Sequence, residues 1–450
     1  MPDCYRNMVA ARSPNQSLTP LSALIDGQGH LVVGGCDVVE LARRFGTPLY
    51  IVDELTLREG CRQYVEALER YYPGPSQVLY ASKAWSNLAI CALVHLCGLG
   101  IDAVSEGELQ TALLAGVPGQ QIYLHGNNKS EAEIRRAATV RATVVADNWL
   151  DLQTLQAAAS DEPVRVMVRV TPGIDIHTHD YIRTGHVDSK FGFNLEDLGD
   201  VLAFLAATPQ LVAVGLHAHI GSQSFELAPH ADVAKLLLEW FAKAAALGLA
   251  DFNELNVGGG LGIRYIEADD PPSIEQWVQT ICEAVVQACE AQRLPLPKLL
   301  CEPGRSLVGP ACITAYTVGS TKTVPGVRTY IAIDGGMSDN PRPITYGARY
   351  SAALANRMND ERSATVTVAG KHCESGDVLL RDVDLPPPEK GDCLVIFGTG
   401  AYNCSMASNY NRLGRPAAVV VGGGDSSLIL RREDLDDLLR CDCLPLRLRT

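Results

Sequence analysis

The sequence lacks three patterns that would assign the protein to a familiar class. Its 14 cysteines form no CxxC pair, so neither a zinc ribbon nor the disulfide framework of a small secreted domain is indicated. No apolar run approaches the ~20 residues of a membrane span, and Met1–Pro20 has no apolar signal-peptide core. We therefore expect reduced thiols and a soluble, cytoplasmic protein in which residues 1–20 form a flexible N-terminal extension.

Basic residues are also scarce relative to acidic ones. The chain has 38 Lys and Arg against 52 Asp and Glu, which gives a net charge of -14. A nucleic-acid backbone or an anionic membrane surface would favour the opposite balance, so neither is expected as a partner, and a small molecule is the better prediction. The 450 residues, 47% of them hydrophobic, exceed what one core usually serves and predict two domains.

Short β-rich runs alternate with helical stretches from residue 76 onward. This alternation is typical of parallel βα units. Eight such units over about 230 residues match the size of a TIM-type (β/α)8 barrel, which we assign to residues 56–310. The expected strands are Val78–Ala81, Gly100–Val104, Ile122–His125, Thr143–Ala146, Val164–Val170, Val212–His219, Glu254–Val257 and Lys298–Cys301.

A second, all-β domain is expected from residues 311–450. Its strand candidates are Ala311–Val318, Thr329–Asp334, Ala364–Ala369, Asp392–Phe397 and Ala417–Val421. Residues 21–55 are also strand-like, at Leu31–Val33 and Leu49–Val52, around a helix at Val38–Phe45. The fold class is therefore α/β: a barrel plus a C-terminal β-rich domain that also takes N-terminal strands.

Catalytic groups of a barrel gather where its strands end, and the first predicted strand ends in Tyr80-Ala81-Ser82-Lys83. By itself, Lys83 would be assigned as a solvated loop lysine. At a barrel mouth, however, a desolvated lysine has a lowered pKa and can bond to an aldehyde cofactor. Both interpretations stay open on this motif alone.

The sixth predicted strand ends in His217-Ala218-His219, and residues two apart on a strand share a face. A hydrogen-bonded core pair and a metal-binding HxH are the competing interpretations. Further His and Asp ligands are not evident at later strand ends, and His177 and His179 fall in a polar stretch typical of a loop. We therefore predict no metal.

The last two predicted strands end in motifs suited to an anionic cofactor. Gly258, Gly259 and Gly260 let backbone N–H groups approach an anion, although a glycine run alone usually marks only a turn. Glu302 and Arg305 follow the eighth strand, where a structural ion pair is the ordinary interpretation. A carboxylate beside a pyridine nitrogen would instead keep the ring protonated and electron-accepting.

Together the motifs resemble those of the diaminopimelate decarboxylases, whose alanine-racemase-like fold is shared with ornithine and arginine decarboxylases. The resemblance extends from about residue 30 to residue 420 and departs at Glu106, where the family has a small residue. It is carried by YASKA at 80–84, HAHIGSQ at 217–223, NVGGGLG at 256–262, CEPGRS at 301–306, DNPRPITYGA at 339–348, CESGD at 373–377 and GAYNCSMASNYN at 400–411.

The resemblance implies that pyridoxal 5'-phosphate is the cofactor and that Lys83 carries it covalently. His219 would stack on its ring, and Glu302 would pair with the pyridine nitrogen. Cys373, which alone would be taken as an ordinary thiol, would come from a partner subunit and protonate the carbanion left by CO2. The phosphate would be held by Ser222, Gly258, Gly259, Gly260, Gly304, Arg305 and Tyr402.

The resemblance also implies the substrate, meso-diaminopimelate, whose far end carries an amine and a carboxylate. Arg305, Arg342, Tyr346 and Tyr402 would contact it, and Glu374 would take the amine. A site built for a carboxylate should reject ornithine and lysine, because its arginines would be left unpaired.

Three alternatives remain open on the sequence alone. One is a sister enzyme that decarboxylates ornithine, lysine, arginine or carboxynorspermidine, and Arg342, Tyr346 and the CES motif argue against it. A catalytically inactive binding protein would tend to lack Lys83 or Cys373, and a metal-dependent barrel hydrolase is a third possibility. An active site shared between two chains predicts a homodimer.

Overall fold

The structure, a computed structural model, describes residues 13–159, 163–174 and 189–449, so His177 and His179 lie outside the described residues. Chain contacts divide it into two compact units. Unit 1 contains Met1–Ser17, Thr56–Arg264 and Ala268–Gly309, and unit 2 contains Leu18–Leu55, Tyr265–Glu267 and Pro310–Thr450.

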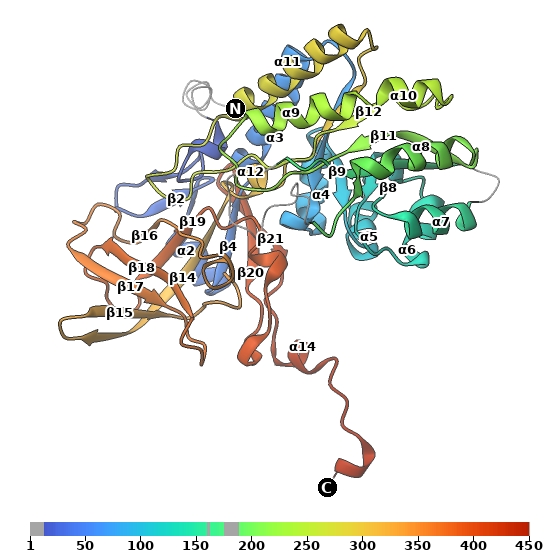
Figure 1. Ribbon diagram of the computed structural model, residues 1–450. Helices are drawn as coiled ribbons and strands as arrows, with labels where there is room; N and C mark the ends of the chain where they lie inside the picture. Colours follow the sequence, from blue (N-terminus) through green and yellow to red (C-terminus); the bar gives the residue numbers. More distant parts are fainter. Residues whose placement is uncertain (1–12, 160–162, 175–188, 450) are drawn as a thin grey trace. The chain divides into compact units, whose positions relative to one another are not determined.

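Unit 1 is built on a closed barrel of eight parallel strands (Figure 1). A pairing between β8 and β9 closes the sheet, and the short β10 (Phe193–Asn194) adds to β9. This confirms the predicted TIM-type barrel, and each of the eight predicted strands overlaps an observed one, although the sixth ends at His217 and not at His219. The strands are β5 (Ser76–Ala81), β6 (Gly100–Ala103), β7 (Ile122–Leu124), β8 (Thr143–Ala146), β9 (Val164–Thr171), β11 (Leu211–His217), β12 (Glu254–Asn256) and β13 (Lys298–Cys301).

Helices lie outside these strands (Figure 1). Several begin at a side chain that accepts a hydrogen bond from the helix's first turn, as Asn87, Ser105 and Ser130 do. Such caps satisfy backbone N–H groups that have no partner within the helix. The helices are α3 (Glu54–Tyr71), α4 (Leu88–Leu96), α5 (Glu106–Leu114), α6 (Glu131–Thr139), α7 (Trp149–Ala158), α8 (Leu198–Ala206), α9 (Ala228–Leu238), α10 (Phe241–Ala246), α11 (Ile274–Gln292) and the short α12 (Arg305–Val308).

The barrel interior explains why polar groups gather at one end. The interior of the barrel contains an apolar layer made of six buried side chains: Leu79, Tyr123, Val145, Met167, Val214 and Leu300. Because alternate residues of a strand share a face, the positions two residues beyond this layer also face inward. Four of the six positions carry polar residues, namely His125, Asp147, Arg169 and Glu302, all buried at the carboxyl ends of the strands.

Unit 2 is a β-rich fold that includes strands from both parts of the chain. β4 (Leu49–Asp53) pairs with β14 (Cys312–Val324) and with β20 (Ala417–Gly422), so the predicted N-terminal contribution is confirmed. Its other strands are β1 (Leu24–Ile25), β2 (Leu31–Val33), β3 (Cys36–Asp37), β15 (Arg328–Ile333), β16 (Ala352–Leu354), β17 (Ala364–Ala369), β18 (Val378–Leu385), β19 (Cys393–Phe397) and β21 (Asp425–Leu430), with helices α2 (Val38–Phe45), α13 (Arg342–Tyr346) and α14 (Leu435–Leu439).

Residues Ser13–Ser17 differ from the predicted loose extension. They belong to unit 1, where the buried Asn15 donates to the carbonyl oxygens of Gly262 and Pro272 at 3.0 and 2.8 Å. These long-range bonds hold the segment in place, so the prediction of flexibility is wrong for these residues. Among the described residues, no helix is long and apolar enough to cross a membrane.

Candidate active site

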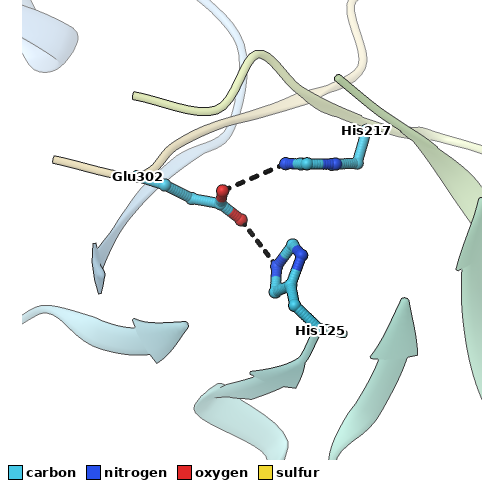
Figure 2. Close-up of side chains that lie close together, drawn as sticks. All are labelled: His125, His217 and Glu302. Atoms are coloured by element: carbon cyan, nitrogen blue, oxygen red, sulfur yellow. Dashed lines mark hydrogen bonds and ion pairs between the residues drawn. The ribbon is translucent and has the colours of Figure 1, made fainter. Parts of the chain in front are cut away.

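Glu302 is the centre of a buried polar cluster at the mouth of the barrel (Figure 2). Its Oε2 lies 3.0 Å from Nε2 of His217, and its Oε1 lies 2.9 Å from Nε2 of His125. Asn256 donates from Nδ2 to the same Oε1 at 2.7 Å. Four separate strand ends thus place three nitrogen atoms around one carboxylate.

The cluster keeps Glu302 ionised. Burial alone would raise the pKa of its carboxyl group, but the facing His125 and His217 outweigh this effect and lower that pKa well below its ordinary value. Burial also lowers the pKa of His217, to about 4, so its imidazole is neutral near pH 7. A neutral imidazole can still donate its Nε2–H to the carboxylate.

Lys83 lies in the short turn Ser82–Ala84, directly after β5, and is half-buried. After burial, its positive charge is the largest cause of the lowered pKa of His219, which falls well below the ordinary value. The same charge acts on Asp102 and on Glu108. The Lys83 ammonium therefore lies near the buried polar groups at the barrel mouth.

His219 does not pair with His217, contrary to the idea of two converging imidazoles. Strand β11 ends at His217, so the two-residue alternation does not continue to His219. Instead, Nδ1 of His219 accepts a hydrogen bond from the backbone N–H of Gly259 at 3.2 Å. His217 faces Glu302, and His219 is tied to the glycine loop.

Residues 258–260, the glycine loop, pass so close to neighbouring backbone that a side chain would not fit at Gly258 or Gly259. A Cβ at Gly259 would lie 2.1 Å from the carbonyl oxygen of Glu302, and one at Gly258 would lie 2.6 Å from that of Ala218. Nearby, the guanidinium of Arg305 donates from Nε and Nη2 to Oγ of Ser222, at 3.1 and 2.9 Å. Arg305 therefore joins Ser222 rather than forming an ion pair with Glu302.

In unit 2, Cys373 and Glu374 are exposed, and a buried residue of the same motif explains why. Asp377 accepts hydrogen bonds from the backbone N–H of Met337 at 2.7 Å and of His372 at 3.0 Å, and it lies 2.7 Å from Nδ1 of His372. The backbone N–H of Cys373 donates to Oδ1 of Asn411 at 2.9 Å. Asp377 thus anchors a turn that presents the thiol to solvent, so Cys373 is not a core cysteine.

Arg342 is a buried cation in unit 2, and its surroundings are aromatic. Its guanidinium lies 4.9 Å from the ring centre of Tyr265, and Nη1 donates to the hydroxyl of Tyr350 at 2.8 Å. Among the described residues, no carboxylate forms an ion pair with it. A buried guanidinium normally has an anionic partner, so Arg342 is suited to receive one from a substrate.

Two tyrosines of the predicted site lie in the same unit. Tyr402 adopts a left-handed backbone conformation, with φ of 62°. This conformation is uncommon for a residue with a bulky side chain and is concentrated at functional sites. Tyr346 ends helix α13, and its hydroxyl lies 4.0 Å from the sulfur of Met406.

Comparison with known proteins identifies the family. A family model described as the pyridoxal-binding domain of pyridoxal-dependent decarboxylases matches residues 56–309. The diaminopimelate decarboxylase of Synechocystis sp. is 57% identical, over 98% of this chain and 96% of its own length.

The chain belongs to the diaminopimelate decarboxylase family.

Other relatives of this family agree. The Bacillus subtilis diaminopimelate decarboxylase is 45% identical, over 92% of this chain and 95% of its own. A crystal structure of the M. jannaschii diaminopimelate decarboxylase in complex with L-lysine has a TM-score of 0.89 at 32% identity, and the match covers 97% of this chain and 100% of that one. As a member of the family, the chain is a pyridoxal-dependent decarboxylase.

The residues at the barrel mouth fit pyridoxal phosphate. Glu302 is a buried, ionised carboxylate, which is the group needed beside a pyridine nitrogen. Lys83 faces the same interior. The close-passing glycines and the Arg305–Ser222 pair provide compact polar groups suited to a phosphate.

Three members of the site, His125, His217 and Asn256, were not predicted from the sequence. The sequence indicates His217 only as half of an HxH pair, Asn256 only as part of the motif at 256–262, and His125 only as the last residue of a predicted strand. A signal for His125 was available, because it ends a predicted barrel strand. The donor set His125, His217 and Glu302 also resembles a metal site, but the His217–Glu302 hydrogen bond and the 2.9 Å contact of His125 with Glu302 account for the arrangement.

Proposed function

We propose that the protein decarboxylates meso-2,6-diaminopimelate to L-lysine and CO2, the last step of lysine biosynthesis. The observation that supports this most directly is the buried, ionised Glu302 at the end of β13, the strand that pairs with β5, which ends just before Lys83. When bound, pyridoxal phosphate supplies an aldehyde for the substrate amine and a pyridinium ring that accepts the electrons left by CO2.

All but one of the residues that would hold the cofactor belong to unit 1, and the exception is Tyr402. Lys83 would carry it through Nζ, and Glu302 would keep a proton on the ring nitrogen. Neutral His219, held through Nδ1 by Gly259, would pack against the ring without adding a positive charge. The phosphate would be bound by Ser222, Gly258, Gly259, Gly260, Gly304, Arg305 and Tyr402.

The residues of unit 2 would select the substrate and complete the reaction. Arg342, which has no carboxylate partner among the described residues, would bind the distal carboxylate. Tyr346 and Tyr402 of the same unit would help, as would Arg305 of unit 1. Glu374 would take the distal amine. Cys373 would deliver a proton from Sγ to the carbon that has lost CO2, which exposure of the thiol on an anchored turn permits.

We further propose a cytoplasmic homodimer in which Cys373 of each chain serves the site of the other. An exposed thiol and carboxylate on one turn are suited to complete a neighbouring active site. Sedimentation should give twice the chain mass. Mixing Lys83→Ala and Cys373→Ala subunits should restore activity in mixed dimers, whereas a site within one chain would give none.

The test of the proposed function combines a spectrum with substrate choice. The purified protein should absorb near the visible edge, and borohydride should fix the cofactor onto Lys83, as peptide mass mapping would show. CO2 release would then be compared for meso-diaminopimelate, L-lysine and L-ornithine. Release from diaminopimelate alone supports the proposal. Release from another diamino acid would keep the reaction but assign a different substrate. Absence of any cofactor band would contradict the whole assignment.

A further inference from the structure

We propose that His125 and His217 are positioning residues. Together they hold the Glu302 carboxylate in one orientation and leave one of its lone pairs for the protonated pyridine nitrogen of the cofactor. This inference rests on the proposed function. It concerns neighbours of Glu302 to which the motifs assign no task.

The hydrogen-bonding capacity of the carboxylate limits how many donors can surround it. An ionised carboxylate offers about four acceptor positions. Asn256 donates to Oε1 at 2.7 Å and His217 donates to Oε2 at 3.0 Å. Nε2 of His125 also lies 2.9 Å from Oε1, as an ion-pair contact without hydrogen-bond geometry, so it covers the rest of Oε1. One acceptor position therefore remains on Oε2, which is the capacity that a single ring N–H requires.

The protonation of His217 follows from its hydrogen bond to Glu302. An ionised carboxylate can only accept, so Nε2 of His217 must donate. The low pKa of His217 leaves it neutral near pH 7, with its one proton on Nε2. Its Nδ1 is buried and has no hydrogen-bond partner among the described residues, as expected if this atom carries a lone pair and no proton.

Two buried carboxyl groups lie near His125, and the surrounding charges favour ionisation of Glu302 over that of Asp102. Asp102 Oδ1 lies 3.6 Å from Nε2 of His125, farther than Glu302, and burial raises the pKa of Asp102. Lys83 and Arg169 contribute positive charge to the same interior. Of the two carboxyl groups near His125, Glu302 therefore has the lower pKa and is the one that is ionised. Its contacts with the two imidazoles cause this difference.

The cluster residues come from the ends of barrel strands, which are rigid, and this fixes the orientation of the Glu302 carboxylate. His125, His217 and Glu302 come from the ends of β7, β11 and β13, above the apolar layer of the barrel. Asn256 is fixed in turn, because its Oδ1 accepts the backbone N–H of Gly258 at 3.0 Å. No flexible loop is needed to place these donors.

The experiment compares His217→Leu, which removes the donor, with His217→Gln, whose side-chain amide keeps an N–H at a similar reach. Apoenzyme is titrated with pyridoxal phosphate, and the visible absorbance of the reloaded enzyme is followed against pH. A hydrogen bond to a charged group is worth about 1.5–3 kcal/mol, so His217→Leu should weaken cofactor binding by roughly 10- to 100-fold. His217→Gln should recover most of that affinity.

The matched control is Tyr123→Phe, which removes another buried hydrogen bond to a carboxylate, from Tyr123 to Glu254 at 2.8 Å. Glu254 begins the strand that Asn256 ends, so this bond lies toward the opposite end of the barrel. Tyr123→Phe should leave cofactor affinity and the absorbance profile unchanged.

Three results are decisive. Equal behaviour of His217→Leu and Tyr123→Phe would overturn the proposal, and so would equal losses in His217→Leu and His217→Gln, since the donor would then be irrelevant. Should His217→Leu not fold, the same pair of substitutions at His125 carries the test. A wild-type protein that binds no cofactor would instead contradict the proposed function, a separate outcome.

Discussion

The Nδ1 atom of His219 accepts a hydrogen bond from the backbone N–H of Gly259, 3.2 Å away. This bond requires an unprotonated Nδ1, in agreement with the lowered pKa of His219. It also couples the imidazole to a loop that cannot carry side chains. The position of His219 thus depends on a backbone path that only glycine allows.

Gly259→Ala should therefore disturb the cofactor site. The added Cβ would lie 2.1 Å from the carbonyl oxygen of Glu302, so the loop must shift and the bond to His219 must lengthen or break. We expect at least tenfold weaker binding of pyridoxal phosphate, measured by titration of apoenzyme. Gly107→Ala, where the nearest atom would be 3.7 Å away, is the control. Equal affinities in the two variants would disprove the expectation.

Cys373→Ala should lower kcat by about 10²- to 10⁴-fold, the usual contribution of a positioned proton donor. Cofactor loading should be unchanged, because Cys373 contacts Asn411 through its backbone and not through sulfur. CO2 release and the visible spectrum are the measurements. Cys441→Ala, which changes another exposed thiol, should behave as wild type. A fully active Cys373→Ala enzyme would refute the assigned role.

Arg342→Lys should impair use of diaminopimelate although it keeps the charge. The planar guanidinium can bind a carboxylate through two hydrogen bonds, and an ammonium cannot. Loss of one charge-assisted bond predicts a fall in kcat/KM of about 10- to 100-fold. Steady-state kinetics of Arg342→Lys would be compared with Arg349→Lys at an exposed position. A change confined to cofactor binding would argue against a substrate role.

Unfolding should become easier as the pH falls from about 6.5 to about 4. The pKa values of His217 and His230 are lowered from 6.5 to about 4 by burial. In this window the unfolded chain binds protons that the folded chain does not, so each residue reduces stability by about 1.4 kcal/mol per pH unit. Urea unfolding at several pH values measures the slope. His230→Phe should make it shallower, and an unaltered slope would exclude His230 as a contributor.

Removing metal ions should leave activity unchanged, whereas removing the cofactor should abolish it. Glu302 accepts a hydrogen bond from His217 and lies 2.9 Å from Nε2 of His125, so an ion is not needed to hold the three groups together. Prolonged dialysis against a chelator tests the first expectation. Treatment with hydroxylamine, followed by added pyridoxal phosphate, tests the second. Loss of CO2 release after chelation, restored by a divalent cation, would revive the metal alternative.

The strands of the barrel were predictable because their pattern is local. Each is a short apolar run followed by polar or glycine residues, and the alternation with helices requires no knowledge of distant contacts. The edge strand β21 and strand β18 were missed for the converse reason. Both are largely exposed on one or both faces, and β18 carries charged residues within Val378–Leu385, so neither has a clear apolar pattern.

The functional residues divide in a similar way. Lys83, Glu302 and Cys373 lie in motifs that can be recognised along the chain, and the family resemblance of those motifs is enough to suggest a role for each. The anchoring of Cys373 by Asp377 and Asn411 was not predictable, since these contacts depend on turn geometry.

By itself, the sequence determined the fold class, the barrel strands, the contribution of N-terminal strands to unit 2 and the family. Only the tertiary structure decided which neighbours surround Glu302, and that His217 and His219 serve different partners. It also placed Asn15 against Gly262, a residue 247 positions away. The physical reason is that strand patterns follow from local periodicity, whereas hydrogen bonds between strand ends depend on how the barrel closes.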